Sequence, residues 1–273
     1  MDKIIEYMLA EDEGFGDITS NAVVEKGKEI TAKIISKDEG ILAGMDVIRE
    51  VFEEYGIKVN FWLNDGSEIS KNDLLMSVSG DARTILLLER TVLNLSMRMS
   101  GVATAANHYV DLVKDYEVKV AGTRKTSPAI AKFDKYALSV GGADTHRFSL
   151  DDMVLIKDNH IAACGTPLEA LMKAKANVSF SKKIEIEVET LDDAVECVKN
   201  GADIVMLDNM SPSEVSEVID KLNELNIRQF SLIEVSGGIT EDTIVDYAKL
   251  GVDIISIGAL THSSRSLNFS MKF

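Results

Sequence analysis

The chain has 273 residues, 45% of them hydrophobic, and is long enough to bury a full core in one large domain or two smaller ones. Asp and Glu number 45 against 29 Lys and Arg, a formal charge of -16 that would repel phosphate backbones and anionic membranes. We therefore expect neither nucleic acid nor a membrane as a partner.

The two cysteines, Cys164 and Cys197, form no disulfide framework and lack metal-binding spacing. Their isolation favours reduced thiols and a cytoplasmic location. The first residues show apolar side chains at helical spacing, including Ile5 and Leu9, rather than the basic start and apolar core of a signal peptide.

Residues 1 to about 100 mix strand and helix patterns. Segment 30–35 is apolar, and segment 44–55 has the composition of an apolar helix. In segment 57–63 apolar and polar residues alternate, which predicts a strand with one buried face. Apolar residues recur three or four apart in segment 82–113, which predicts a long helix. This part of the chain is predicted to be α+β.

From residue 117 onward, strand and helix patterns alternate. Each connection suits a right-handed βαβ crossover, so we predict a parallel α/β barrel. An open doubly wound sheet is the alternative, although no glycine-rich dinucleotide motif follows the first strand. The predicted strands are 118–121, 153–156, 184–188, 204–207, 231–235 and 254–257, and helices are predicted at 191–200, 212–225 and 241–250.

The strand at 184–188 carries alternating carboxylates. A period of two places Glu185, Glu187 and Glu189 on the face opposite the isoleucines. If the apolar face packs against helices, the carboxylates point into the barrel, where they need cations, hydrogen-bond donors or a metal. The alternative is an edge strand whose acids lie in solvent. We favour the inward orientation because parallel sheets are covered on both faces.

Cationic or imidazole side chains gather at the predicted strand ends. Any one of them alone would be interpreted as part of a surface ion pair, but five at one rim of an acidic chain indicate a site for an anionic ligand. They are Arg124, Lys125, His146, Arg147 and Lys157.

The last two predicted strands end in glycine turns, Ser236-Gly237-Gly238 and Gly258-Ala259-Leu260. Backbone N–H groups in such turns approach an anion closely, and barrels often bind phosphate at this place.

A second inward acid, Asp208, ends its strand and could hold Mg²⁺ or sugar hydroxyls together with Glu187. Ser211 followed by Pro212 is the better helix cap, which leaves Asp208 available. The residues alone imply a phosphorylated sugar ligand, and isomerase, lyase and glycosyl-transfer chemistry all fit.

These motifs closely resemble one family, quinolinate phosphoribosyltransferase (decarboxylating), also called nicotinate-nucleotide pyrophosphorylase. The combination is specific because the motifs follow one another in order over nearly the whole chain. The matching segments are 11–20, 89–95, 100–104, 121–126, 146–147, 150–160, 184–189, 206–210, 236–239 and 258–262.

The resemblance implies an N-terminal α+β sandwich domain at 1–103, joined by 266–273, and an incomplete α/β barrel at 104–265. It implies transfer of the phosphoribosyl group of 5-phosphoribosyl 1-pyrophosphate to quinolinate with Mg²⁺, yielding nicotinate mononucleotide, pyrophosphate and CO2 for NAD biosynthesis. It also implies a homodimer, or a higher oligomer, in which Arg90 reaches the neighbour's site.

By the family's pattern, the substrate contacts are Arg90, Thr123, Arg124, Lys125, His146, Arg147 and Lys157. Lys125, Glu187 and Asp208 are the expected catalytic residues, the two acids facing the ribose and Mg²⁺ directly or through water. The turns at 236–238 and 258–260 would hold the 5-phosphate. The alternatives are a nicotinate phosphoribosyltransferase, a molybdenum-transport-associated relative, or a non-catalytic sensor of a phosphoribosyl metabolite.

Overall fold

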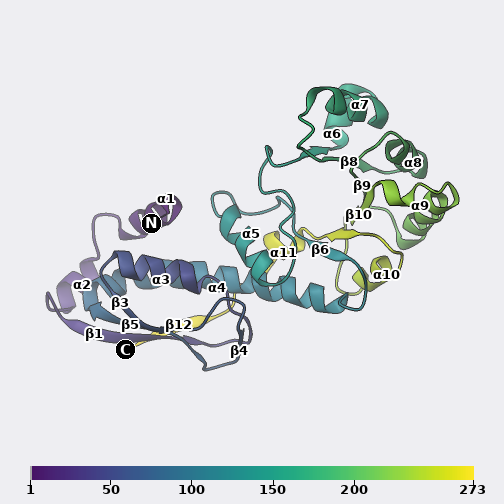
Figure 1. Cartoon of the computed structure of the whole chain (residues 1–273). Coiled ribbons are helices and arrows are strands. Elements are labelled where there is room, and N and C mark those ends of the chain that lie inside the picture. The colour runs from purple at the N-terminus through teal and green to yellow at the C-terminus, as the bar shows by residue number, and fades with distance from the viewer. Residues whose placement is uncertain (1) are drawn as a thin grey trace. The chain divides into compact units, whose positions relative to one another are not determined.

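The structure is a computed structural model that describes residues 2–273, and the chain divides into two compact units (Figure 1). The first unit contains the residues up to 107 together with 126–142 and 260–273. The second contains 108–125 and 143–259. The boundary expected from the sequence lay after residue 103, with 266–273 returning to the first domain.

An antiparallel sheet with strand order β12-β1-β5-β3 lies at the centre of the first unit. The last strand of the chain pairs with β1, with Lys33 opposite Lys272 and Ser36 opposite Phe269. A separate short pair joins β2 to β4. The strands are β1 (Glu29–Ser36), β2 (Gly40–Ile41), β3 (Lys58–Trp62), β4 (Glu68–Ile69), β5 (Leu74–Asp81) and β12 (Phe269–Lys272).

The amphipathic helix α3 (Met45–Glu54) supplies part of the core of this unit. In α3, Ile48, Val51 and Phe52 are spaced three or four apart and buried, and the helix packs against β3 and β5. The Asp65 carboxylate accepts the N–H groups of Gly44 and Met45 and so caps the start of α3. The helices are α1 (Lys3–Glu13), α2 (Ile18–Val23), α3 (Met45–Glu54), α4 (Ala82–Leu112), α5 (Ala131–Val140) and α11 (Ala259–His262), of which the end of α4 and the first residue of α11 belong to the second unit.

The alternation predicted for segment 57–63 only partly describes β3. Ile57 is buried, but Phe61 remains 40% exposed. The pairing register shifts between Val59 and Phe61, and β3 is the edge strand of its sheet. A bulge of this kind interrupts the period of two, so alternation in the sequence no longer predicts which side chains are buried.

The second unit is built on a parallel sheet with order β6-β11-β10-β9-β8-β7, in which β6 and β7 are the two edge strands, so the ring of strands is incomplete. The incomplete parallel α/β barrel predicted from the sequence is confirmed. The strands are β6 (Lys119–Ala121), β7 (Val154–Ile156), β8 (Ile184–Val188), β9 (Ile204–Asp208), β10 (Leu232–Ser236) and β11 (Ile254–Ser256).

Helices cover the outer face of this sheet: α7 contacts β7 and β8, α8 contacts β8 and β9, and α10 contacts β11. Side chains of the inner face line cavities instead, which distinguishes the fold from a doubly wound sheet with helices on both faces. The elements between the strands are α6 (Asp158–Cys164), α7 (Pro167–Asn177), α8 (Leu191–Lys199), α9 (Pro212–Glu224), the 3₁₀ turn η1 (Arg228–Phe230) and α10 (Ile244–Ala248).

Local sequence signals explain where these helices begin. Ser211 and Glu214 form a reciprocal capping box with Pro212 in the first turn of α9, as the sequence predicts. Thr166 and Glu169 do the same for α7. Within residues 2–273, no helix has both the length and the apolar composition needed to span a bilayer.

Candidate active site

A cavity of about 460 Å³ opens at the carboxyl ends of the parallel strands. Residues of β7, β8, β9, β10 and β11 and of the loop after β6 reach it, which shows that the sheet curves around a common centre. Its lining comprises Gly122, Thr123, Arg124, Lys125, His146, Arg147, Leu155, Lys157, Glu187, Met206, Asp208, Asn209, Glu234, Ser236, Gly237, Gly238 and Ser256.

Strand register explains why polar side chains converge there. Glu187 lies opposite Met206, and Ser236 lies opposite both Asp208 and Ser256, so alternate residues of adjacent strands share the inner face. The inward orientation predicted for the glutamates of β8 holds for Glu185 and for Glu187, both of which are buried, Glu187 at the cavity wall. Glu189 follows the strand and is exposed.

A second, larger cavity of about 830 Å³ opens toward the other ends of the strands and shares His146 and Arg147 with the first. Its remaining lining is mixed in charge and apolar character and does not gather the predicted cations and acids. In α/β barrels chemistry occurs at the carboxyl ends of the strands. We therefore assign the smaller cavity as the candidate active site.

The ion pair between Lys157 and Glu187 spans the cavity wall. Lys157 follows β7, and its Nζ lies 2.6 Å from Oε2 of Glu187 on the neighbouring strand. The Lys157 side chain is 43% exposed, whereas Glu187 is 10% exposed. The lysine thus neutralises an inward acid while part of its ammonium group stays accessible to a ligand.

Asp208 supplies a second carboxylate at the end of β9, where its Oδ2 accepts a hydrogen bond of 2.5 Å from the Asn209 side chain. Burial raises the pKa of Asp208, and the charge of Glu187 raises it further, while Lys157 and Lys125 lower it. Two carboxylates that repel each other across a cavity are suited to a divalent cation with oxygen ligands. Glu187 and Asp208 are therefore the residues of this cavity that could hold a divalent cation such as Mg²⁺.

Arg124 and Arg147 both line the cavity. Arg147 is buried, and burial together with the nearby charge of Arg124 lowers its pKa. Arg124 and Lys125 are exposed on the loop after β6, where Thr123 Oγ1 accepts the Lys125 N–H at 3.0 Å. Cations that share a cavity repel each other, and a bound anion offsets this repulsion. These side chains are therefore suited to bind a carboxylate or a phosphate.

The turn after β10 needs glycine for a steric reason. Gly237 has φ of 95°, and a Cβ at this position would lie 2.2 Å from Oδ1 of Asn209. Gly238 also has a positive φ, 63°, but a Cβ there would meet no atom within 4 Å. The backbone of the turn therefore packs closely on the loop after β9, while Gly238 remains open toward the cavity.

Gly237→Ala is expected to lower the free energy of unfolding by about 2 kcal/mol or more. Alanine tolerates the positive φ of this position poorly, and its Cβ would also clash with Asn209. The midpoint of thermal unfolding should fall by about 4–8 °C. Gly238→Ala is the matched control, since it introduces the same side chain at positive φ in open space. Equal losses for the two variants would show that the contact with Asn209 does not constrain the turn.

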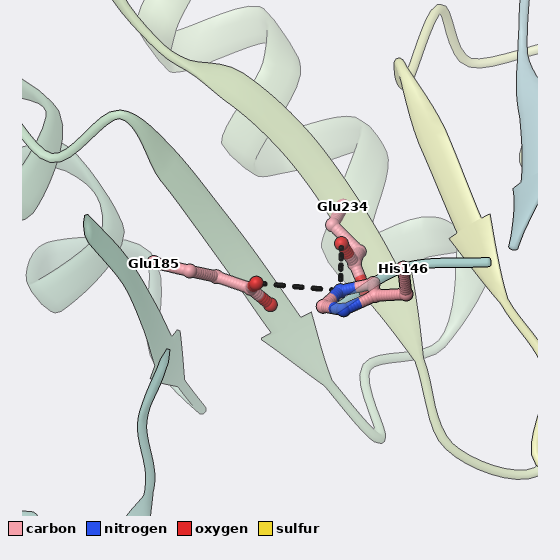
Figure 2. Close-up of side chains that lie close together, drawn as sticks. All are labelled: His146, Glu185 and Glu234. Atoms are coloured by element: carbon pink, nitrogen blue, oxygen red, sulfur yellow. Dashed lines mark hydrogen bonds and ion pairs between the residues drawn. The ribbon is translucent and has the colours of Figure 1, made fainter. Parts of the chain in front are cut away.

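Beneath the cavity lies a buried cluster of His146, Glu185 and Glu234 (Figure 2). The His146 Nε2 atom is 3.3 Å from Oε2 of each glutamate, and both glutamates are fully buried. Burial raises the pKa of Glu185, the hydrogen bond with His146 lowers it, and the charge of Glu234 raises it further. The cluster joins β8 and β10 through a residue of the loop before β7.

Some residues predicted from the sequence do not reach this cavity. Arg90 lies on α4 in the first unit, where it lines a separate pocket with Glu11 and Asp12. Gly258, Ala259 and Leu260 follow β11 outside the cavity lining, and the Leu260 side chain is fully buried. The remaining predicted contacts, from Thr123 to Gly238, meet in one place.

Sequence reasoning missed Glu234, Asn209 and Ser256, all of which line the cavity. Glu234 carried a usable signal, since it is an acid at the centre of an otherwise apolar strand, two residues before Ser236. Asn209 carried one as well, since it follows Asp208 in a polar cluster at the end of a predicted strand. Ser256 carried none, because only strand pairing places it beside the glycine turn and the loop after β6.

Comparison with known proteins gives two family matches and close full-length relatives. The descriptions "Quinolinate phosphoribosyl transferase, N-terminal domain" and "C-terminal domain" match residues 17–100 and 102–272. A protein of Methanocaldococcus jannaschii described as a probable nicotinate-nucleotide pyrophosphorylase (carboxylating) is 50% identical over 273 residues, covering 98% of this chain and 95% of the relative. A protein of Methanothermobacter thermautotrophicus with the same description is 42% identical over 271 residues, covering 98% and 97%. The crystal structure of NadC from Streptococcus pyogenes superposes with a TM-score of 0.92 at 38% identity, covering 100% of this chain and 96% of that one.

Proposed function

The chain belongs to the quinolinate phosphoribosyltransferase family, and we propose that it transfers the phosphoribosyl group of 5-phosphoribosyl 1-pyrophosphate to quinolinate with loss of CO2. The products are nicotinate mononucleotide and pyrophosphate, for use in NAD biosynthesis. One observation carries the proposal: Arg124, Lys125, Arg147 and Lys157 share a single cavity with Glu187, Asp208 and the glycine turn. A substrate with two carboxylates and a phosphorylated sugar needs that combination.

Quinolinate and the ribose occupy different walls of the cavity in this proposal. Arg124 and Arg147 hold the carboxylates of quinolinate, because paired guanidinium groups bind carboxylate oxygens in bidentate fashion. The turn at 236–238 offers backbone N–H groups to the 5-phosphate. This arrangement directs the pyridine nitrogen toward C1 of the ribose, which Glu187 and Asp208 face.

The reaction forms the bond between the pyridine nitrogen and ribose C1 as the bond from C1 to the pyrophosphate oxygen breaks. Positive charge that develops on the ribose is stabilised by Glu187 and Asp208, and Lys125 and Lys157 stabilise the negative charge of the leaving group. The carboxylate beside the ring nitrogen then leaves as CO2, its electron pair stays on that ring carbon next to the pyridinium nitrogen, and a proton takes its place. The cavity contributes mainly orientation and exclusion of water to this step.

Glu187 and Asp208 would hold Mg²⁺, directly or through water, because both carboxylates line the cavity and Mg²⁺ prefers oxygen ligands. When bound, the ion supplies charge neutralisation to the pyrophosphate. We further propose a homodimer, or a higher oligomer, in which Arg90 enters the neighbouring chain's site. The cytoplasm is the proposed location, in keeping with two free cysteines.

A measurement of pyrophosphate release distinguishes the proposed enzyme from a non-catalytic sensor. Purified chain supplied with 5-phosphoribosyl 1-pyrophosphate and Mg²⁺ should release pyrophosphate only when quinolinate is added. Asp208→Asn should slow this release by about a hundredfold, because a charge-stabilising carboxylate is lost. Asp220→Asn, on the exposed face of α9, removes the same charge away from the cavity and should have no effect. Binding of both substrates without release would favour a non-catalytic sensor.

A further inference from the structure

The buried cluster beneath the cavity contains two acids that the proposed reaction does not use. Glu185 and Glu234 come from strands on either side of β9, and both side chains point to the ring of His146 (Figure 2). Oε1 of Glu185 and Oε1 of Glu234 have no hydrogen-bond partner within the described part of the chain. A buried acid without a function is costly, so the cluster requires an explanation.

The backbone at His146 is in a conformation that needs support. Its φ is 53°, a left-handed value that side-chain-bearing residues adopt at an energetic cost and that is concentrated at functional sites. Its N–H donates to Oδ1 of Asp144 at 2.7 Å. Asp144 is itself tied to β6, since its N–H donates to Val120 and its carbonyl accepts from Gly122. The hydrogen bonds between Asp144 and β6 therefore fix the backbone just before His146, and this sets where Arg147 begins.

Both nitrogens of the His146 ring are engaged by the protein. Nδ1 accepts the backbone N–H of Arg147 at 2.8 Å, so Nδ1 carries a lone pair. The proton of the neutral ring is then on Nε2, which faces the two glutamates at 3.3 Å. Burial opposes a charge on this ring, whereas Glu185 and Glu234 favour one and raise its pKa overall, to about 10. A second proton on Nδ1 would, however, break the 2.8 Å bond from the Arg147 N–H, so the geometry is that of the neutral ring. In this arrangement the ring offers no nitrogen to a substrate.

The same cluster has the composition of a metal site, because its three ligand atoms lie within 4.8 Å of one another. A histidine that binds a metal through one nitrogen normally donates the other N–H to the protein. Here the other nitrogen accepts a hydrogen bond instead. A metal at Nε2 would displace the proton to Nδ1 and eject the Arg147 N–H, so the geometry opposes that assignment.

We propose that His146 is a positioning residue, held from inside the sheet by Glu185 and Glu234, and that its ring fixes Arg147 in place for an anionic substrate. The substrate named, quinolinate, rests on the proposed function. Arg147 is only 7% exposed, and within residues 2–273 its guanidinium group makes one weak hydrogen bond, from Nη1 to the Met153 carbonyl at 3.4 Å. Its direction therefore depends on the backbone that His146 holds.

The first test compares pairs of substitutions in steady-state kinetics. His146→Ala and Glu234→Ala should each raise the quinolinate KM by about tenfold to a hundredfold, with less than about a threefold change in the KM for 5-phosphoribosyl 1-pyrophosphate. Glu234→Gln should recover most of the loss, because its amide oxygen still accepts the Nε2 proton. A quinolinate KM that rises for His146→Ala but not for Glu234→Ala would show that His146 binds substrate directly, and would overturn the proposal.

The second test measures the protonation state of the His146 ring by NMR. It needs neither catalysis nor folded alanine variants. The ¹⁵N resonances of His146 in the unchanged chain should be those of the neutral Nε2–H form and should stay so when quinolinate is added. A resonance shift typical of a newly bonded nitrogen, or one equivalent of Zn²⁺ or Mn²⁺ bound to the unchanged chain and lost in Glu234→Gln, would overturn the proposal. A failure of the proposed function would appear separately, as absence of product from the unchanged chain.

Discussion

Arg147→Ala is expected to raise the quinolinate KM by about thirtyfold or more while the chain stays folded, since truncating one member of a desolvated charged pair removes about 2–5 kcal/mol of binding free energy. Arg147 is buried at the cavity wall, and it shares that wall with Arg124. Steady-state kinetics with varied quinolinate measure the effect.

Two further variants separate geometry from charge. Arg147→Lys keeps the charge but loses the planar fork, so it should recover only part of the affinity. Lys183→Ala removes an exposed cation from the other ends of the strands and should leave the KM unchanged. Loss of folding in Arg147→Ala, seen by circular dichroism, would instead show that this arginine mainly neutralises the buried Glu185.

Arg98→Ala is expected to destabilise the first unit by about 3–5 kcal/mol, because it leaves a buried carboxylate without its partner. Arg98 donates Nε and Nη2 to the two oxygens of Asp134, each at 3.0 Å, and also donates to the Thr261 carbonyl. The Asp134 side chain is fully buried. Urea unfolding followed by fluorescence of Trp62, the single tryptophan, reports this unit directly.

The matched control for Arg98 is Arg265, which pairs with Asp38 at 3.3 Å with 83% of its side chain exposed. Arg265→Ala should change stability by less than about 1 kcal/mol, as is usual for surface pairs. The double variant Arg98→Ala, Asp134→Ala should be more stable than Arg98→Ala alone, because the unpaired charge is gone. Equal effects of Arg98→Ala and Arg265→Ala would contradict the assigned role of burial.

Much of the second unit follows from its sequence. The strand predicted at 184–188 has those limits in the structure, and the helix predicted from Pro212 begins there because Ser211 caps it. The cations at strand ends meet Glu187 and Asp208 because parallel strands bring all their carboxyl ends to one side. Periodicity and helix capping depend on residues close together in the chain, so they can be predicted from the sequence.

The features that could not be predicted from the sequence depend on contacts between segments that are far apart in the chain. The convergence of Glu185 and Glu234 on His146 requires the register of three strands. The bulge in β3 interrupts a pattern that otherwise predicts a buried face. Segment 126–142 belongs to the first unit, where Asp134 meets Arg98 far from it in sequence. None of these follows from spacing along the chain.

The most direct test of the central claim follows a carbon label in the carboxylate at C2 of quinolinate. With 5-phosphoribosyl 1-pyrophosphate and Mg²⁺, the chain should release that label as CO2 in equal amount to the nicotinate mononucleotide formed, and nicotinate offered in parallel should give no product. The opposing guanidinium groups of Arg124 and Arg147 predict this preference for a dicarboxylate. Product from nicotinate alone, or from neither substrate, would contradict the account.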